Sequence, residues 1–366
     1  RKIDWKEKRL IYMKKNVLII DDSALMRRVL SDIINSDDRF IVSDFAVNGL
    51  EGIDLIVRNP NKYAAVLLDI NMPKMNGIEL LEQLEKYHIN MAVIIVSTVA
   101  KKDAKETIRA LELGAFDFVT KPENFLQMKG DIFRNRLLQC LFLATNQTHV
   151  AEASDMKERK AISRRKENYN KSNASKLIAL ACSTGGPKAL QAVIPRLPKE
   201  MDAAMLVVQH MPEGFTKTLA ERLNELSEVT VKETKDGDII QKGVVYIAKG
   251  GHQMRLLRQA SGEYRLSVTS EAARYGLKPC ADIMYESLID SAFDQITCVV
   301  LTGMGSDGTK GIKQLEQKKR TYVIAQNEAT CTVYGMPKVI KETGLVDEVV
   351  PLNEVADAII RNVGVH

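Results

Sequence analysis

The sequence predicts two α/β domains, each built on a doubly wound parallel sheet, and three observations carry this prediction. The chain has 366 residues, enough for about two domains of ordinary size. Short apolar runs alternate with helical patterns both in residues 14–144 and in residues 176–366, which is typical of parallel sheets covered on both faces. Between them, residues 145–175 are rich in Lys, Arg, Glu, Asn and Ser and have few large apolar residues, which predicts a polar interdomain linker.

The first region predicts five strands that alternate with helices. The expected strands are residues 17–20, 40–42, 65–68, 93–96 and 116–119. The expected helices are residues 25–34, 49–57, 77–87, a segment through 108–113, and one more after Pro122. Each apolar run is short enough to be a buried strand, so we expect a five-stranded parallel sheet.

The second region predicts another α/β unit, interrupted by a β-rich insertion. Buried strands are expected at residues 178–181, 205–208, 296–301 and 322–325. Residues 229–270 contain several short strand patterns, and residues 281–292 have helical spacing. The whole unit is therefore expected to be Rossmann-like, with extra strands in its middle.

Composition limits the classes of protein that fit. The net charge of +5 is mild and gives no basic stripe typical of nucleic-acid binding. The five cysteines are scattered without zinc-site spacing, which favours a reduced, cytoplasmic protein. No apolar run is long enough to span a bilayer, so direct membrane insertion is not expected. Residues 1–13 are charged and lack a signal-peptide core, and we expect them to be an N-terminal extension before a start at Met13.

Three carboxylates are expected to converge at one edge of the first sheet. Asp21 and Asp22 follow the first strand, and Asp69 follows the third. Ligands of open parallel sheets bind at the carboxyl ends of the strands. Three carboxylates there would repel one another without a hard cation, and Mg²⁺ accepts a few oxygen ligands while it keeps its waters. The pattern predicts a Mg²⁺ site in which one carboxylate could accept a phosphoryl group.

Hydroxyl and ammonium groups are expected at the same edge. Ser97 and Thr98 end the fourth strand and Lys121 ends the fifth, where they could bind phosphoryl oxygens. A purely local interpretation also exists, in which Asp22 caps the following helix and Asp69 begins a turn. The combination of these residues at successive strand ends favours the phosphoryl site.

A nucleophile, a base and an orienting carboxylate follow three strands of the second region. Ser183 follows LIALAC, His210 follows MLVVQ, and Asp307 lies just beyond CVVLTGMGS. Because parallel strands end at one edge, the three side chains could meet there as a catalytic triad. The order Ser, His, Asp differs from that of α/β-hydrolases, and there is no GxSxG elbow, but triads are recognised by geometry.

The turn after the first of these strands suits acyl transfer. Residues 183–187 read STGGP, with Pro187 at the first helical position, so backbone N–H groups and a helix N-terminus could hold an oxyanion. Local interpretations remain open: Ser183 and Asp307 could both be helix caps. Cys182 is an alternative nucleophile, although it ends an apolar strand and is expected to point into the core.

Two other classes of protein must be weighed against an esterase. Residues 303–308 match GxGxxG between a strand and a helix, and Glu328 follows the next strand, as in dinucleotide-binding proteins. Against this, Asp307 would place a carboxylate where a pyrophosphate must bind. A DNA-binding output domain would need a helix-turn-helix after the linker, and alternating strands and helices are found there instead.

The first region resembles a response-regulator receiver domain, which has a flavodoxin-like fold. The resemblance covers residues 15–135 and rests on IIDDS, LLDINMPKMNG and FVTKP. It implies that Asp69 is the phosphoacceptor and that Asp21 and Asp22 bind Mg²⁺ with it. It also implies a metal contact from the backbone of Asn71.

The receiver resemblance further implies a switch residue beside Lys121. Two adjacent hydroxyls, those of Ser97 and Thr98, compete for this position, and the alignment of the strand favours Ser97.

The second region resembles the catalytic domain of the chemotaxis protein-glutamate methylesterase family. The resemblance covers residues 177–350 and rests on CSTGGPKAL, QHMPEGFTKTLAERLN, VYIAKGGHQM, LTGMGSDG and IAQNEATCTVYGMP. It implies that Ser183 is the nucleophile, His210 the base and Asp307 the residue that orients the base. The implied oxyanion and support positions are Thr184 and the backbone of Met304.

One stretch departs from the family pattern. Residues 278–281 read Lys-Pro-Cys-Ala where an Arg-Pro-Ser-type loop is expected, and this loop is expected to touch substrate.

The resemblance implies hydrolysis of glutamate methyl esters on methyl-accepting chemotaxis receptors, with deamidation of receptor glutamines as a second activity. A chemotaxis histidine kinase is the implied phosphodonor. Mg²⁺ is expected in the receiver, and no cofactor is expected in the esterase domain.

Overall fold

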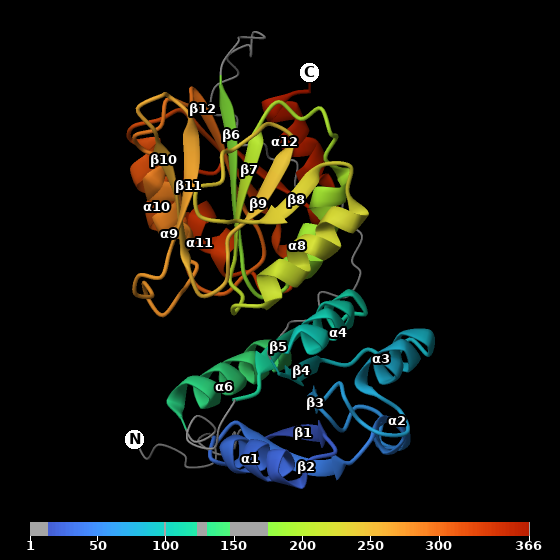
Figure 1. Cartoon of the computed structure of the whole chain (residues 1–366). Coiled ribbons are helices and arrows are strands. Elements are labelled where there is room, and N and C mark those ends of the chain that lie inside the picture. The colour runs from blue at the N-terminus through green and yellow to red at the C-terminus, as the bar shows by residue number, and fades with distance from the viewer. Residues whose placement is uncertain (1–13, 99, 123–129, 147–174, 366) are drawn as a thin grey trace, which may run out of the picture. The chain divides into compact units, whose positions relative to one another are not determined.

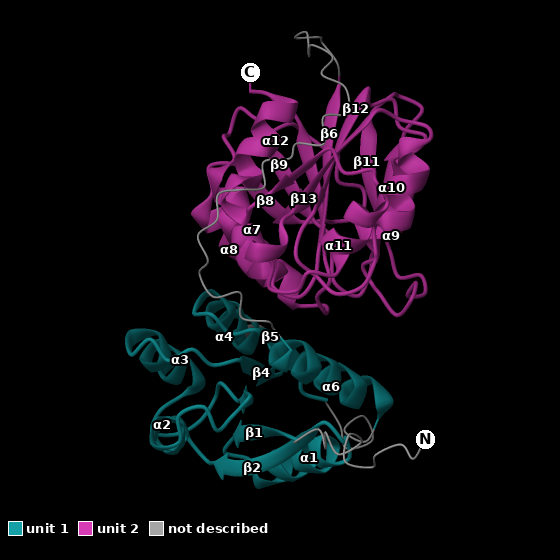
Figure 2. Cartoon of the chain, turned by 180° about the vertical axis from the view of Figure 1, so that it is seen from behind, with its two compact units in different colours: residues 1–147 teal, residues 148–366 magenta. Residues whose placement is uncertain are grey.

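The computed structural model describes residues 14–98, 100–122, 130–146 and 175–365. The chain divides into two compact units, residues 1–147 and 148–366, shown in teal and magenta in Figure 2. The predicted linker lies almost entirely outside the described residues, as does the predicted N-terminal extension. Each unit is considered by itself below.

The first unit is a five-stranded sheet in the order β2-β1-β3-β4-β5, and every strand pair is parallel (Figure 1). The strands are β1 (Lys15–Ile20), β2 (Phe40–Ala46), β3 (Ala65–Leu68), β4 (Val93–Ser97) and β5 (Asp117–Thr120). The helices are α1 (Ala24–Asn35), α2 (Gly49–Arg58), α3 (Gly77–Lys86), α4 (Lys101–Glu112) and α6 (Asp131–Thr145). Helices α1 and α6 pack together, and α3 packs between α2 and α4. This is the flavodoxin-like order expected from the sequence.

The second unit is built on a seven-stranded sheet, all parallel, in the order β14-β13-β12-β6-β7-β9-β8. Its strands are β6 (Lys176–Cys182), β7 (Ala204–Gln209), β8 (Thr230–Glu233), β9 (Val244–Ile247), β12 (Gln295–Val300), β13 (Thr321–Gln326) and β14 (Glu348–Val350). A separate antiparallel hairpin contains β10 (Gln253–Arg258) and β11 (Tyr264–Thr269).

The helices of the second unit form two groups. One group contains α7 (Gly186–Val193), α8 (Phe215–Leu226) and α12 (Val355–Val363), with the short turns η2 (Ile194–Arg196) and η4 (Leu352–Glu354). The other contains α9 (Ala281–Ser287), α10 (Thr309–Glu316) and α11 (Met336–Glu342), and η3 (Glu328–Thr330) follows β13. The β-rich insertion is smaller than expected, because β8 and β9 extend the main sheet and only the hairpin stands apart.

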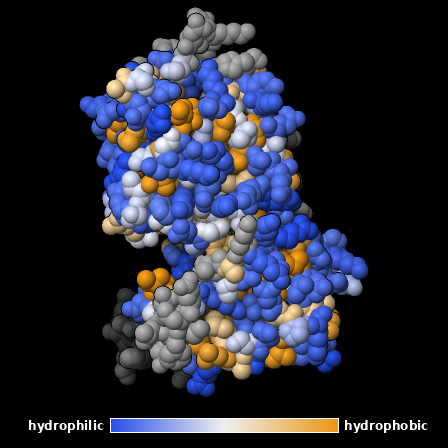
Figure 3. All heavy atoms as spheres, in the orientation of Figure 1, coloured by the Kyte–Doolittle hydropathy of each residue, from blue (hydrophilic) through white to orange (hydrophobic). Residues whose placement is uncertain are grey.

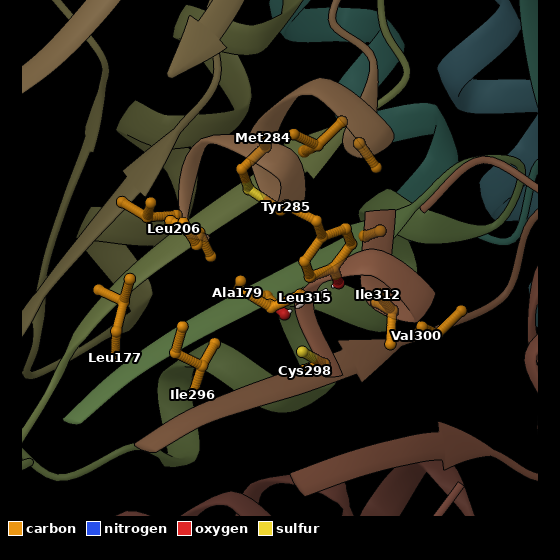
Figure 4. Packing of buried hydrophobic residues seen from close by; sticks show 14 of the residues in the cluster. Leu177, Ala179, Leu206, Met284, Tyr285, Ile296, Cys298, Val300, Ile312 and Leu315 are labelled. Carbon is orange, nitrogen blue, oxygen red and sulfur yellow. Dashed lines mark hydrogen bonds between the residues drawn. The ribbon is translucent and has the colours of Figure 1, made fainter. Parts of the chain in front are cut away.

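Helix α9 is anchored in the core by a buried tyrosine (Figure 4). Tyr285 is fully buried, and its hydroxyl donates to the carbonyl of Ala179 in β6 at 3.0 Å. A buried hydroxyl needs such a partner, because leaving it unpaired costs about 1–3 kcal/mol. The anchor fixes the helix over β6 and β12, and so fixes the loop that leads into its N-terminus. The helix ends at Ser287, earlier than the predicted 292.

The visible face of each unit is mostly hydrophilic, with apolar residues scattered over it (Figure 3). Within the described ranges, no helix is long and apolar enough to cross a membrane.

Candidate active site and acidic pocket

The predicted triad lies where the direction of strand order reverses in the second sheet. From β6 the chain adds β7 and β9 on one side, and it later adds β12, β13 and β14 on the other. Ser183 follows β6, His210 follows β7, and Asp307 lies in the loop after β12. Such a switch point leaves a crevice at the carboxyl ends of the strands, where open α/β sheets bind ligands. The strand-end rule therefore brings the predicted residues to one edge.

His210 and Asp307 form a close pair. The Nε2 atom of His210 lies 2.7 Å from Oδ2 of Asp307, and both side chains are at least nine-tenths buried. Burial opposes ionisation of Asp307, but the hydrogen bond and charge of His210 and two backbone N–H groups outweigh it and lower the pKa of Asp307 to about 2. An ionised carboxylate only accepts, so we assign the proton to Nε2, which leaves Nδ1 as the basic nitrogen.

The Asp307 carboxylate is held by donors on both oxygens. His210 Nε2 and Ala281 N bind Oδ2, while Oδ1 accepts from Cys280 Sγ, Asp282 N and Gly308 N, at 2.6–3.1 Å. The N-terminal end of α9 supplies most of these donors. A carboxylate with so many donors stays charged and keeps one orientation. Residues 278–281, which depart from the family pattern, were expected to touch substrate, but the thiol of Cys280 is buried and contacts Asp307 instead.

Ser183 stands in a tight turn at the end of β6. Its N–H donates to Thr302 O at 3.0 Å, and its carbonyl accepts from Gly186 N at 2.7 Å. Gly185 has a φ of +77°, a backbone conformation that residues with a side chain rarely adopt. A Cβ atom on Gly303 would lie 2.8 Å from Cβ of Ser183, so glycine is needed for this close approach. The turn directs the chain straight into α7.

The described residues show no hydrogen bond between the side chains of Ser183 and His210. Their backbones are nonetheless tied, since His210 N donates to the carbonyl of Cys182 at 3.1 Å. Catalytic hydrogen bonds in unliganded enzymes are often long and tighten only when substrate binds.

Gln209 is a site residue that the sequence analysis missed. Its side-chain amide donates to the carbonyls of Ser183 and His210 at 3.0 and 3.2 Å, and its oxygen accepts from Cys182 Sγ at 3.0 Å. A Cβ on Gly186 would meet this oxygen at 1.9 Å. The buried amide therefore ties together the ends of β6 and β7. A polar residue ending a buried apolar strand was the available signal.

Cys182 points into the core, as expected. It is fully buried, burial raises the pKa of its thiol, and its sulfur contacts Gln209. A thiol kept neutral in this way is a poor nucleophile.

The two positions implied for oxyanion binding lie beside the serine turn. Thr184 is buried, and its carbonyl accepts from Thr302 Oγ1 at 3.0 Å. Met304 is 40% exposed and follows Gly303, which abuts Ser183. Their roles toward an oxyanion stay predictions.

The acidic pocket of the first unit lies between the ends of β1 and β3. Ligand atoms of Asp21, Asp22 and Asp69 lie within 4.8 Å of one another. Lys121 Nζ lies 3.1 Å from Asp21 Oδ2 and 2.9 Å from Asp69 Oδ1. Burial is the main reason why the pKa of Asp69 is raised to about 6, with Asp21 adding to it and Lys121 opposing. The residues fit a cation, because Asp21 Oδ2 is buried and accepts no hydrogen bond of good geometry.

The two candidate switch hydroxyls differ in their surroundings. Ser97 is buried at the end of β4, and its Oγ accepts from Thr107 Oγ1 at 2.8 Å. Thr98 is exposed and donates to Asp103, which also accepts from the Asn71 side chain at 3.0 Å.

The local interpretation of the three carboxylates, in which Asp22 caps the following helix, is wrong about the cap. Ser23, not Asp22, caps α1, because its side chain accepts from Met26 N. Asp69 Oδ1 does accept from the next backbone N–H, that of Ile70, at 2.9 Å, but it contacts Lys121 as well.

Comparison with known proteins decides the family. Residues 178–359 match the family model described as CheB methylesterase, and residues 17–133 match that of the response regulator receiver domain. A protein-glutamate methylesterase/protein-glutamine glutaminase from Syntrophomonas wolfei is 39% identical over 352 residues, which cover 95% of this chain and 99% of the relative. The chain belongs to this family.

Further relatives agree. A protein of the same name from Halalkalibacterium halodurans is 41% identical over 350 residues, 94% of this chain and 97% of the relative. The crystal structure of the Thermotoga maritima CheB methylesterase catalytic domain is 39% identical, has a TM-score of 0.50, and covers 52% of this chain and 100% of that one. The chain is thus a protein-glutamate methylesterase/glutaminase with a receiver domain, and the dinucleotide-binding and DNA-binding alternatives are wrong.

Proposed function

We propose that this methylesterase demethylates glutamates of chemotaxis receptors through a triad of Ser183, His210 and Asp307, and that phosphorylation of its receiver activates it. The observation that carries the proposal is the geometry of the His210–Asp307 pair. Because Asp307 binds Nε2 at 2.7 Å, Nδ1 is left to take a proton. In the serine proteases that define the triad, the carboxylate binds the other nitrogen, but the roles are the same.

The reaction is acyl transfer followed by hydrolysis. His210 Nδ1 takes the proton of Ser183 Oγ as the oxygen attacks the ester carbonyl of the glutamate side chain. Asp307 stabilises the imidazolium that forms. The intermediate collapses, and methanol leaves with the proton returned by His210. Water then attacks the acyl-enzyme by the same base, which frees the glutamate carboxylate and Ser183. With a glutamine substrate, ammonia leaves in place of methanol.

An oxyanion develops on the carbonyl oxygen during both steps. Backbone groups near Thr184 and Met304 are the proposed donors, at the N-terminal end of α7 and beside it. One such donor contributes a factor of roughly 10²–10³ to the rate in other acyl-transfer enzymes. The esterase half needs no cofactor for this chemistry.

We further propose that Asp69 accepts a phosphoryl group from a chemotaxis histidine kinase. Asp21, Asp22, Asp69 and the backbone of Asn71 would hold Mg²⁺, which would neutralise charge on the phosphoryl oxygens. The contacts of Lys121 with Asp21 and Asp69 support this, since a phosphoryl group on Asp69 would meet the ammonium directly.

The switch hydroxyl completes this proposal. The burial of Ser97 at the strand end favours it over the exposed Thr98. We expect the enzyme to act in the cytoplasm, on the signalling regions of its receptors and without binding nucleic acid.

The test measures methanol released from receptor membranes that carry labelled methyl esters. We expect release by the full chain, and faster release when a small-molecule phosphodonor and Mg²⁺ are present. Asp69→Asn is the matched control and should keep the basal rate while it loses the stimulation and the hydroxylamine-sensitive label. Undiminished, hydroxylamine-resistant label on Asp69→Asn would exclude the acyl phosphate. Absence of methanol release would exclude the esterase reaction on these receptors.

A further inference from the structure

Cys280 is a buried thiol directed at the carboxylate of the proposed triad. Its sulfur lies 3.1 Å from Oδ1 of Asp307, and the residue is 1% exposed. It occupies the N-cap position of α9, and its backbone N–H donates to Gln253 Oε1 at 2.8 Å. Gln253 is itself fully buried in β10. Cys280 is therefore fixed by two hydrogen bonds, one from its backbone to Gln253 and one from its thiol to Asp307.

The thiol is a donor in this position. Burial first, and then the charge of Asp307 and the hydrogen bond to it, raise the pKa of Cys280 to about 12. A thiolate would place two anions side by side in a buried site, which is costly. The sulfur therefore keeps its proton at any pH at which the enzyme works, and the S–H bond points at the carboxylate.

Cys280 differs in kind from the other donors to Asp307. Ala281, Asp282 and Gly308 donate through backbone N–H groups, which side-chain substitutions other than proline leave in place. Among the described residues, only His210 and Cys280 donate to Asp307 through a side chain. Each donor draws charge from the carboxylate and so weakens it as an acceptor for the others.

We propose that Cys280 is a positioning residue of the esterase: its thiol binds Oδ1 of Asp307 and weakens the hydrogen bond between Oδ2 and His210. The inference rests on the proposed triad. A weaker Asp307–His210 bond favours the neutral imidazole over the imidazolium, so the thiol extends activity toward lower pH. Being buried, it acts through Asp307 and not on the substrate.

Other titratable groups face the same pair and form a constant background. Asp282 and Tyr285 from α9 interact electrostatically with Asp307, and Arg274 from the segment before α9 interacts with Cys280. Arg274 binds Glu286 at 2.7 Å, and Asp282 Oδ1 accepts from Gly311 N at 2.8 Å at the start of α10. Substitution of Cys280 leaves these partners in place, so a change in pH profile can be assigned to the thiol.

The experiment compares Cys280→Ala, which lacks the donor, with Cys280→Ser, which keeps one. The readouts on the full chain are kcat/KM for methanol release as a function of pH, and the proton resonance of the His210 Nε2–H group. For Cys280→Ala we expect the acid limb of kcat/KM to move up by about half a pH unit. That is a loss of roughly threefold on the acid side. The resonance should move downfield, as expected of a stronger hydrogen bond.

Cys280→Ser gives a second, independent test. A hydroxyl is a better donor than a thiol, so its acid limb should stay at or below that of the wild type. If Cys280→Ala is too unstable to measure, the resonance in Cys280→Ser still decides: it should move upfield, because a hydroxyl draws more charge from Asp307 than a thiol does, and a resonance left in place would contradict the inference. Cys298→Ala is the matched control, because Cys298 is also a fully buried thiol but lies in β12 within the core (Figure 4). It should lower the melting temperature without moving either readout.

The outcomes separate this inference from the proposed triad. If the resonance stays in place in both Cys280 variants, the thiol only fills space and the inference is wrong. The same conclusion follows if Cys280→Ser moves the acid limb upward as far as Cys280→Ala does. If the resonance moves as expected but the pH profile does not, the hydrogen bond is established and His210 is not the base, which overturns the proposed triad.

Discussion

The two units place a buried aspartate at the same edge of the same kind of sheet and give it opposite properties. Asp69 follows β3 and Asp307 follows β12, and both are less than a tenth exposed. The pKa of Asp69 is raised to about 6, mainly by burial, whereas hydrogen bonds overcome burial and lower the pKa of Asp307 to about 2. The fold sets the position of the carboxylate, and the number of donors around it sets its charge state.

This difference suits two different tasks. Asp69 shares a single lysine with Asp21, so its charge is incompletely satisfied. Such a carboxylate can be matched by a cation, and one of its oxygens is available to attack a phosphoryl group. Asp307 is surrounded by donors and is fixed as a permanent anion next to His210. These properties fit the proposed roles, a reactive phosphoacceptor for Asp69 and an inert residue that orients the base for Asp307.

The largest effect is expected from removing the proposed nucleophile. Ser183→Ala should fold normally and lose methanol release by a factor of about 10⁴–10⁶, as for triad nucleophiles in general. Cys182→Ala is the matched control, since its sulfur lies in the core beside Gln209. If Ser183→Ala keeps more than about a tenth of the activity while Cys182→Ala loses it, the nucleophile is wrongly assigned.

The second prediction changes the charge of Asp307 and keeps its shape. Asp307→Asn should lower kcat by a factor of about 10³–10⁴, because an amide cannot stabilise the imidazolium and favours the wrong tautomer of His210. The second unit should also lose about 2–4 kcal/mol of stability, since buried N–H groups of Ala281 and Asp282 lose a charged acceptor. Steady-state kinetics and calorimetry of the full chain measure the two effects. A variant with wild-type kcat would show that Asp307 does not orient the base.

Most of the fold could be predicted because its central strands are short and mostly apolar. The segments KNVLII, AVLL, VIIVS and KLIALAC become β1, β3, β4 and β6, which are almost completely buried. Elements with weaker patterns were less well predicted. Strand β14, with three residues, was missed. The region of β8 and β9 was expected to contain strands but was assigned to an insertion, because a sequence does not tell which sheet a short strand joins.

The site could be predicted only where its residues end strands. That rule predicted Ser183, His210 and Asp307, which lie at the same edge of the second sheet. Gln209 also ends a strand, β7, and was overlooked although that signal was available. The contact of Cys280 with Asp307 joins two separate loops, which the sequence alone does not bring together. Cys280 contacts Asp307 from the start of α9, and Tyr285 anchors this helix over β6 through a contact between residues 106 positions apart.

The third prediction concerns coupling between the two carboxylate sites. If residues 145–175 are a linker, as predicted, the receiver stays at high effective concentration near the esterase. If it covers the cleft until Asp69 is phosphorylated, a fragment of residues 176–366 should act faster on receptor membranes than the unphosphorylated full chain. A typical coupling of about 1–3 kcal/mol gives roughly 5- to 150-fold. Phosphorylation should bring the full chain toward the rate of the fragment or beyond it.

The fragment keeps Ser183, His210 and Asp307 and removes only the receiver, so the comparison isolates its effect. A fragment that is no faster than the full chain would mean that the receiver does not block the site. Activation would then have to come from better docking on receptors.

The smallest effect is expected from Asp69→Asn. This variant should stabilise the first unit, whereas Asp307→Asn should destabilise the second. The folded-state pKa of Asp69, about 6, lies above the unfolded value of about 3.9, so the folded state binds the proton more tightly. Stability of the first unit should therefore rise as pH falls from about 7 to 4. The pKa of Asp307, about 2, lies below the unfolded value, so its contribution to the second unit is present above about pH 4 and is lost as pH falls toward 2.

Asp69→Asn removes the buried charge and should stabilise the first unit by about 1–2 kcal/mol at neutral pH in EDTA, less what is lost with the Lys121 contact. The variant should also lose the rise in stability between pH 7 and 4. Mg²⁺ should reverse the order, because it binds only the wild-type set of three carboxylates and stabilises that folded state. Denaturant titrations of the full chain at pH 4.5 and 7.5, with EDTA or Mg²⁺, measure all four conditions. If Asp69→Asn destabilises the first unit in EDTA at neutral pH, the carboxylate is satisfied by its surroundings, and the contrast with Asp307 disappears.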